Sequence, residues 1–281
     1  MGLGLTQVIG LAQGFGLTQG FGLSQAIVYA VQVFFLVFLR MTGMFVVSPI
    51  FGRQNLPVYY KIGFSFFMAL VVVESIAPAA PQTGGSILEY AIVALREFIV
   101  GACVGFVPFL MFSAIYIAGQ LIDMKIGFSM VSVLDPVSNL QIPITSNFYF
   151  IICMLLFVTL RAHHTVILTI VTSYSLIPLG SLSFDGDLMQ TLIRLFSDVF
   201  SVGFRIAAPI VFTVLLTDVA LGTISKAMPQ INVFMVGMPL KILVGIVIMI
   251  ITMPAMLVIL GGLFDNIGLE TVNFMKGLGA Q

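Results

Sequence analysis

The sequence predicts an all-α membrane protein, and three observations support that prediction. Hydrophobic residues make up 60% of the 281 residues and charged residues only 8%, whereas a soluble domain is usually about 25% charged. Apolar runs approaching the roughly 20 residues that a helix needs to cross a bilayer recur along the chain. Eleven basic residues balance eleven acidic ones, so nothing in the charge favours nucleic acid as a partner.

Residues 1–25 form a Gly-rich lead with a near repeat, GLGLTQ, GFGLTQ and GFGLSQ, which starts at Gly2, Gly14 and Gly20. The lead lacks the basic start and the cleavage site of a secretory signal, so we expect it to stay on the mature protein. Two interpretations remain open: a flexible or interface-bound lead, and a segment with a specific docking role.

Seven apolar runs follow the lead, and we expect each to be helical. They cover residues 26–50, 62–80, 98–118, 148–160, 165–182, 199–221 and 242–264. The clean long runs are 98–118 and 242–264. Pro108, Pro178, Pro209 and Pro254 lie within the runs and are expected to bend or break their helices. The connections are too short to hold a soluble catalytic module, and their Lys and Arg residues do not favour one orientation.

Four charged residues interrupt these runs: Arg40, Glu74, Arg205 and Asp218. An unpaired charge at the bilayer centre costs roughly 3 kcal/mol. Partners are therefore expected within the fold or on other subunits.

Two further pairs of charges bracket the cleanest run. Arg96 and Glu97 precede it, and Asp123 and Lys125 follow it. They are expected either to anchor the helix at the two membrane interfaces or to pair with charges on neighbouring subunits. A proton relay through Glu74, Glu97 and Asp218 is a third interpretation.

No catalytic or nucleotide-binding motif occurs in the sequence, so we expect neither an enzyme nor a cofactor. Cys103 and Cys153 lack the spacing of metal ligands and are interpreted as buried thiols. His163 and His164 are adjacent, point to different faces, and are expected in a mobile turn after Arg161. No metal site is predicted.

The stretch GQLIDMKIGFSMVSVLDPVSNLQIPITSN, residues 119–147, is both apolar and irregular. Turn-forming residues such as Asp135, Pro136 and Pro143 should prevent one continuous helix. Irregular backbone at membrane depth is tolerated only where protein buries it or where it lines a cavity.

Four stretches resemble the FliR family of export-gate proteins, in the family's order. They are LRMTGMFVVSPIFG from Leu39, YKIGFSFFMAL from Tyr60, GQLIDMKIGFSMVSVLDP at 119–136, and KAMPQINVFMVGMPLKILVG at 226–245. The last stretch looks more like the flagellar branch than the injectisome branch of type III secretion. The resemblance covers residues 35–262.

This resemblance implies kinked helical hairpins in a helical pore assembly, largely lifted out of the bilayer plane. A FliP-like portion, residues 26–190, would precede a FliQ-like hairpin with a C-terminal tail, residues 191–281. The implied function is a subunit of the flagellar export gate in the bacterial inner membrane, at the flagellum basal body. With FliP and FliQ it would form the channel for unfolded flagellar proteins, and FlhB would surround the cytoplasmic mouth.

The resemblance also implies three groups of functional residues. The loop 127–142 would plug the pore, with Phe128, Met130, Val131, Val133, Leu134, Asp135, Pro136 and Leu140 as its main residues. An assembly motif comprises Pro229, Gln230, Asn232, Pro239 and Lys241; its two prolines are expected to break helices, and the other three to satisfy backbone or partner groups. Buried charge pairing is expected of Arg40, Glu74, Arg96, Glu97, Arg205 and Asp218.

A polytopic secondary transporter of a small solute or ion is the alternative. Such proteins are built on broken helices and intramembrane carboxylates. They often contain an inverted repeat, which this sequence does not show.

Overall fold

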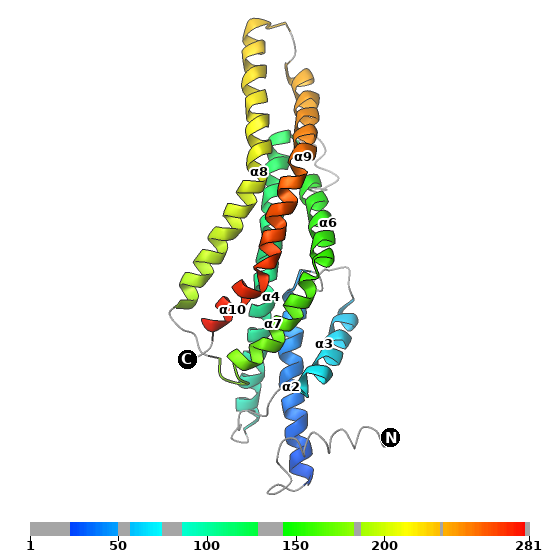
Figure 1. Ribbon diagram of the computed structural model, residues 1–281, viewed down its shortest axis with the longest axis vertical. Coiled ribbons are helices and arrows are strands. Elements are labelled where there is room, and N and C mark those ends of the chain that lie inside the picture. The colour runs from blue at the N-terminus through cyan, green and yellow to red at the C-terminus, as the bar shows by residue number, and fades with distance from the viewer. Residues whose placement is uncertain are drawn as a thin grey trace. The chain divides into compact units, whose positions relative to one another are not determined.

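The computed structural model describes residues 23–49, 57–74, 86–128, 143–182, 187–230 and 233–278. Nearly all of these residues are helical (Figure 1), which confirms the all-α prediction. The helices are α2 (Leu23–Val47), α3 (Val58–Val73), α4 (Ile87–Ile126), α6 (Ile144–Thr159), α7 (Ala162–Leu176), α8 (Asp187–Ala227), α9 (Val233–Asp265) and α10 (Ile267–Lys276). Four of them are long and apolar enough to cross a membrane, or five spans if α6 and α7 count as one broken span.

Two helices extend well beyond their predicted apolar runs. α4 already begins at Ile87, and α8 extends from Asp187 to Ala227. At 1.5 Å per residue each is about 60 Å long, roughly twice the hydrocarbon core of a bilayer. Length alone therefore does not say which part of either helix lies in the membrane.

Four prolines lie inside continuous helices. They are Pro108 in α4, Pro209 in α8, and Pro239 and Pro254 in α9. Pro108, Pro209 and Pro254 were expected to bend or break their helices; no helix ends at them, and α8 does change direction along its length (Figure 1). The expectation that Pro239 breaks a helix is wrong, because α9 continues through it. Each proline removes one backbone donor, and long apolar helices tolerate this loss because neighbouring helices and local adjustments satisfy the freed groups. Pro178, in contrast, follows the end of α7.

The chain folds into two compact, interleaved units. The first comprises Met1–Phe109, His164–Leu192 and Ile267–Gln281, and the second Leu110–His163 and Ile193–Asn266. One crossing between the units, at Leu192, lies next to the predicted boundary between residues 190 and 191. The linear division into residues 26–190 and 191–281 stays a prediction.

Close contacts between α2, α3 and α4 organise the first unit. α2 and α3 lie side by side (Figure 1), with the rings of Phe34 and Phe66 5.2 Å apart. Gly101 of α4 faces the backbone of Arg40, and a side chain there would collide with it. Gly105 is similar, because a Cβ would lie 2.6 Å from the Met44 carbonyl oxygen. Small residues of this kind let apolar helices approach closely.

An aromatic cluster forms the core of the second unit. Phe112 of α4, Phe157 of α6 and Phe264 of α9 lie with ring centroids 5.2–5.7 Å apart. All three side chains are buried. Edge and tilted ring contacts add to the free energy gained from burial.

Two features differ from the sequence-based expectations. His163 and His164 lie in the first turn of α7 rather than in a mobile turn, because Arg161 takes up the break between α6 and α7 with a φ of 56°. The helix α10 was not predicted. It is amphipathic and buries Ile267, Phe274 and Met275.

Candidate functional site

A buried ion pair joins α2 and α4 in the first unit. The Arg40 side chain is 0% exposed and the Glu97 side chain 1% exposed. Nε of Arg40 donates to Oε2 of Glu97 over 2.6 Å. The Gly101 contact places the two backbones close enough for this pair to form.

The helix α7 and the residues that follow it complete the environment of the ion pair. Nη1 of Arg40 donates to the Ile177 carbonyl at 3.0 Å and to Oγ of Ser173 at 3.3 Å. The Tyr174 ring lies under the guanidinium, 4.3 Å from Cζ to the ring centroid. On the other side, the Gly180 N–H donates to Oε1 of Glu97 over 2.7 Å. We call Arg40, Glu97, Ser173 and Tyr174 the charge node.

The charge node fixes how three helices meet. Taking two charges out of water costs several kcal/mol per ion, and only good geometry with additional hydrogen bonds recovers that cost. Here both carboxylate oxygens of Glu97 accept hydrogen bonds. Of the three guanidinium nitrogens of Arg40, only Nη2 has no hydrogen-bond partner among the described residues.

A second ion pair joins α8 and α9 in the second unit. Nζ of Lys241 contacts Oδ1 of Asp218, and both side chains are partly exposed. The pair links α8, which precedes the turn at residues 228–230, to α9, which follows it. It brings together one residue predicted for charge pairing and one predicted for the assembly motif.

The other residues predicted for charge pairing are not brought together. Glu74 is an exposed residue at the C-cap of α3. Arg96 and Arg205 are exposed, and neither makes an ion pair with another described residue. The three carboxylates of the suggested proton relay, Glu74, Glu97 and Asp218, thus lie in three different settings.

Asp123 has a local structural role at the start of α6. Its side chain is buried, and its two carboxylate oxygens accept from the Thr145 N–H at 3.0 and 3.2 Å. Pro143, the N-cap of α6, provides no side-chain hydrogen bond. Asp123 therefore caps α6 from the end of α4. Glu97 and Asp123 thus both have hydrogen-bond partners within the chain, and the interface-anchor interpretation stays a prediction.

A second contact reinforces the junction of α4 and α6. Oγ of Ser146 donates to the Tyr116 carbonyl over 3.1 Å. Gly119 lies so close to the Ser146 backbone that a side chain would collide with it. We call the contacts of Asp123 with Thr145, and of Tyr116 and Gly119 with Ser146, the α4–α6 clamp.

Only one of the predicted plug residues is described. Phe128 is half-buried in the turn after α4, next to Gly127, whose φ of 102° ends the helix. The remaining ones, Met130, Val131, Val133, Leu134, Asp135, Pro136 and Leu140, lie outside the described residues.

The assembly motif divides between a turn and a helix. Pro229 and Gln230 are exposed in the turn after α8, and Pro239 is exposed within α9. Lys241 lies in α9 and pairs with Asp218. Asn232 lies outside the described part of the chain.

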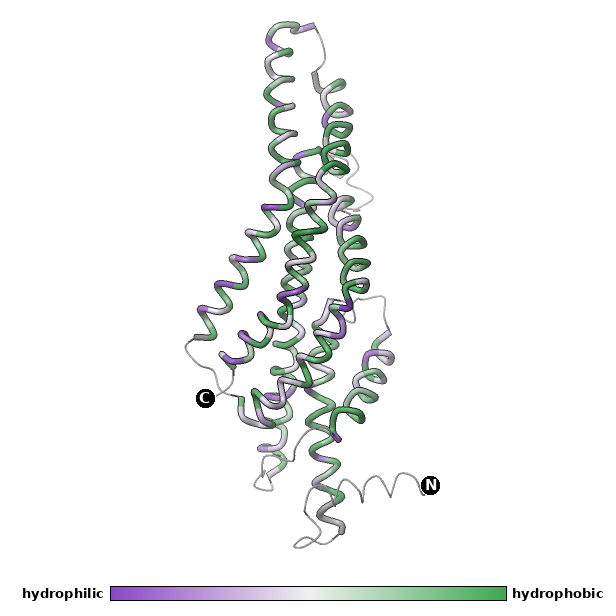
Figure 2. The backbone as a smooth tube through the Cα atoms, viewed as in Figure 1, coloured by the Kyte–Doolittle hydropathy of each residue, from purple (hydrophilic) through white to green (hydrophobic). Residues whose placement is uncertain are grey.

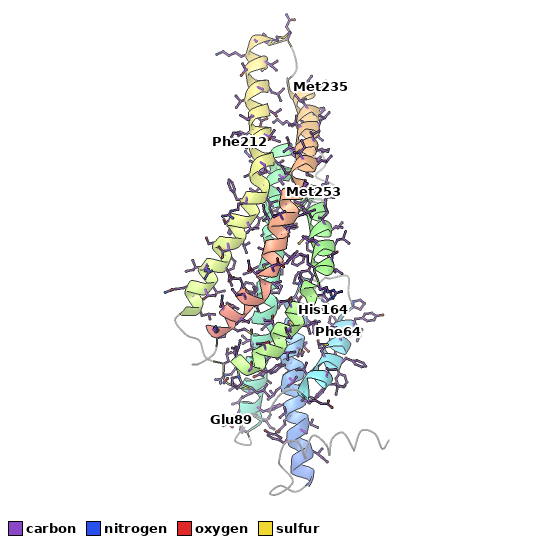
Figure 3. The ribbon with its side chains drawn as sticks, viewed as in Figure 1. Phe64, Glu89, His164, Phe212, Met235 and Met253 are labelled. Carbon is purple, nitrogen blue, oxygen red and sulfur yellow. The ribbon has the colours of Figure 1, made fainter. Side chains whose placement is uncertain are left out.

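Large apolar side chains cover the outside of α8 and α9. Figure 2 shows that α9 is hydrophobic along most of its length. Phe212 on α8 and Met235 on α9 project from their helices (Figure 3) and are 61% and 74% exposed. Such surfaces need to be covered by lipid or by other protein.

The potential metal ligands of the described residues are not gathered into a site. No group of three His, Cys, Asp or Glu residues within them is arranged to hold an ion. Cys153 is buried and Cys103 half-buried, and both are free thiols. The charge node is enclosed and its groups are engaged with one another, which indicates a structural role.

Comparison with known proteins agrees with this arrangement. The family model of "Bacterial export proteins, family 1" matches residues 31–267. The flagellar biosynthetic protein FliR of Bacillus subtilis is 33% identical over 87% of this chain and 95% of its own length. FliR of Escherichia coli is 26% identical over 84% of this chain and 90% of its own. FliR of Aquifex aeolicus is 26% identical, with 82% and 88% covered.

The match covers α2 from residue 31 onward and every helix from α3 to α9, and this range includes the charge node, the α4–α6 clamp and the Asp218–Lys241 pair. Apolar helices able to span a bilayer fit a membrane-embedded export component. The chain therefore belongs to the FliR family of bacterial export proteins.

Proposed function

We propose that this chain is a subunit of the flagellar type III protein export gate. With FliP and FliQ it forms the channel through which unfolded flagellar proteins cross the bacterial inner membrane at the basal body, and FlhB occupies the cytoplasmic mouth. The observation that carries the proposal is the family match over residues 31–267, because the relatives that share it are flagellar biosynthetic proteins. The chain acts as a structural part of the channel and not as an enzyme.

Exposed charges on apolar helices support a place inside an assembly. Arg96 and Arg205 are exposed although they lie in helices that could span a bilayer. Facing lipid near the bilayer centre would cost roughly 3 kcal/mol for each. Neighbouring subunits or a water-filled conduit would remove this cost, and FliP and FliQ are the partners that we expect to supply them.

Within this proposal, residues 127–142 plug the resting pore. Support comes from the α4–α6 clamp, because Asp123 and Thr145 are 22 positions apart and yet hydrogen bonded. The chain between them must therefore leave from and return to the same place. Its apolar composition suits a plug, because apolar side chains exclude water from a constriction.

Native mass spectrometry tests the assembly. The tagged chain is produced together with FliP and FliQ from the same organism and purified in mild detergent. We expect a heteromeric complex with little free chain. A stable lone protein that binds neither partner and moves a solute across liposomes would instead establish the secondary transporter.

Deleting residues 129–141 tests the plug. We expect greater ion leak and poorer growth under salt stress, because the constriction would no longer exclude water. Deleting residues 2–14, an equal length of the Gly-rich lead, is the matched control. If the complex still assembles by mass spectrometry and the leak is unchanged, the segment is not the plug.

A further inference from the structure

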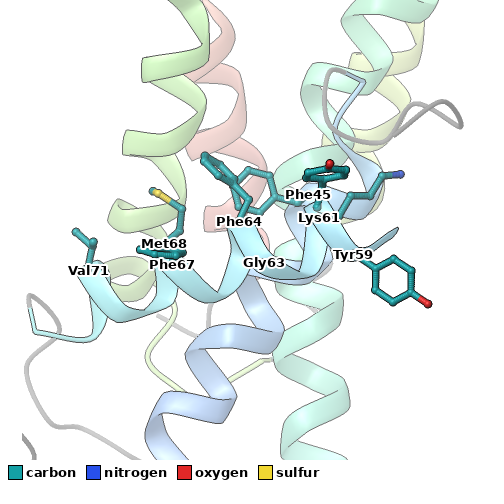
Figure 4. A pocket seen from close by; sticks show the side chains of 9 residues that line it. Phe45, Tyr59, Lys61, Gly63, Phe64, Phe67, Met68 and Val71 are labelled. Carbon is teal, nitrogen blue, oxygen red and sulfur yellow. The ribbon is translucent and has the colours of Figure 1, made fainter. Parts of the chain in front are cut away.

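A groove of about 720 Å³ runs along α3 in the first unit (Figure 4). Phe64, Phe67, Met68 and Val71 of α3 line it, and Phe45 of α2 closes one side. Lys61 lies at the N-terminal end with Tyr59 and Tyr60. Nothing in the export function proposed above uses this groove.

The groove has a polar end and an apolar end. Lys61 is the one charged residue of α3, and Figure 4 shows its amino group projecting at one end of the groove and Val71 at the other. A rise of 1.5 Å per residue separates Lys61 and Val71 by about 15 Å along the helix. The groove thus fits an elongated molecule with one anionic end.

The helix α3 itself has the composition of a segment that meets the bilayer interface. Tyr and Lys gather at its N-terminus, as they do at the headgroup level of membrane proteins, and the remainder is apolar. Its 16 residues extend about 24 Å, less than the roughly 30 Å of the hydrocarbon core. Tyr59 and Phe67 are 87% and 71% exposed, so this face of α3 is open.

The single basic end followed by an apolar length favours a lipid rather than a helix as the occupant of the groove. A single acyl chain is narrower and has no backbone polar groups to satisfy.

We infer that the α3 groove binds an anionic phospholipid. Lys61 pairs with the lipid phosphate, and an acyl chain lies along Phe64, Phe67 and Val71. Gly63 lines the groove and has no side chain to fill it, and the position that a Cβ would take there is open space, with no heavy atom within 4 Å. A lipid held here would position the short helix α3 against α2 at a defined depth in the membrane.

Tryptophan fluorescence in vesicles tests this inference. The chain contains no tryptophan, so Phe67→Trp gives a single reporter in the groove, and Phe212→Trp gives a matched reporter on α8 with similar exposure. The full-length protein is reconstituted in phosphatidylcholine vesicles that contain phosphatidylglycerol, with bromine on the acyl chains of one lipid or the other. Bromine quenches the reporter when that lipid is bound beside it.

We expect the Phe67→Trp reporter to prefer phosphatidylglycerol by about fivefold, the factor expected for one basic side chain at an anionic headgroup, and the Phe212→Trp reporter to show no preference. Lys61→Gln should abolish the preference. Gly63→Leu should abolish it too, by filling the groove, and should leave the fold intact because Leu favours a helix more than Gly.

Three outcomes would overturn the inference. Equal quenching by the two lipids at Phe67→Trp would show that the groove does not select a headgroup. A preference that survives Lys61→Gln would mean that Lys61 does not bind the phosphate. If adding FliP and FliQ to the vesicles abolishes the quenching, a protein partner occupies the groove. The first two outcomes do not depend on the channel proposal, which native mass spectrometry tests separately.

Discussion

Replacing Glu97 by Gln should strongly destabilise the chain. The substitution keeps the shape of the side chain and an acceptor for the Gly180 N–H. It leaves the Arg40 guanidinium, 0% exposed, without a counter-ion. Removing one partner of a buried pair typically costs about 3–5 kcal/mol, because the remaining charge is left uncompensated.

The magnitude follows from the surroundings of Arg40. Its remaining contacts after the substitution are the Ile177 carbonyl, Oγ of Ser173 and the face of the Tyr174 ring. These are dipoles and a quadrupole, which stabilise a cation but do not neutralise it. Because 1 kcal/mol shifts the midpoint by about 2–4 °C for a chain of this size class, we expect a loss of about 6–20 °C.

Thermal unfolding of the purified chain in one detergent, followed by circular dichroism, measures the effect. Glu89→Gln is the matched control, since Glu89 lies in the exposed first turn of the same helix and should cost less than about 1 kcal/mol. The double variant Arg40→Met with Glu97→Met should recover much of the loss. A Glu97→Gln midpoint no lower than that of Glu89→Gln would refute the reasoning.

Three further predictions concern other contacts. Gly101→Ala should cost about 1–3 kcal/mol because its Cβ would enter the Arg40 backbone, whereas Gly261→Ala, which meets open space, should be neutral or stabilising; equal midpoints for the two variants would contradict this. Asp123→Ala should lower the free energy of unfolding by about 0.5–2 kcal/mol through loss of the cap on α6, and hydrogen exchange at the start of α6 should rise; unchanged exchange there would exclude the cap. Lys241→Gln should change the unfolding free energy by less than about 1 kcal/mol, because the pair with Asp218 is partly exposed; a larger loss in the isolated chain would show that the pair is effectively buried.

The sequence predicted the helical class and the need for ion partners, since both follow from composition and from charge within apolar runs. It did not predict which charges pair. Glu97 stands beside Arg96 at the edge of an apolar run, and only the extension of α4 back to Ile87 places it inside the fold. The partner of Arg40 depends on the close approach that Gly101 permits, which is a tertiary property.

Pro239 was a source of error in the predicted fold. A rule derived from soluble helices assigned a break to it, yet α9 continues through it. The cap that Asp123 gives to α6 could not be predicted either, because its acceptor and donor are 22 positions apart. The one available signal in the sequence was a carboxylate, Asp123, early in the irregular stretch of residues 119–147.

The great length of α4 and α8 has a consequence for how the chain enters the membrane. The charge-free part of α4, residues 98–122, is longer than the hydrocarbon layer, so the helix can shift along the membrane normal to some extent before a charge enters that layer. Its vertical register is then not encoded in the helix alone. Register would be chosen when the charge node closes and neighbouring proteins cover the remainder, so a newly inserted chain and an assembled one should expose different residues of α4 to water-soluble reagents.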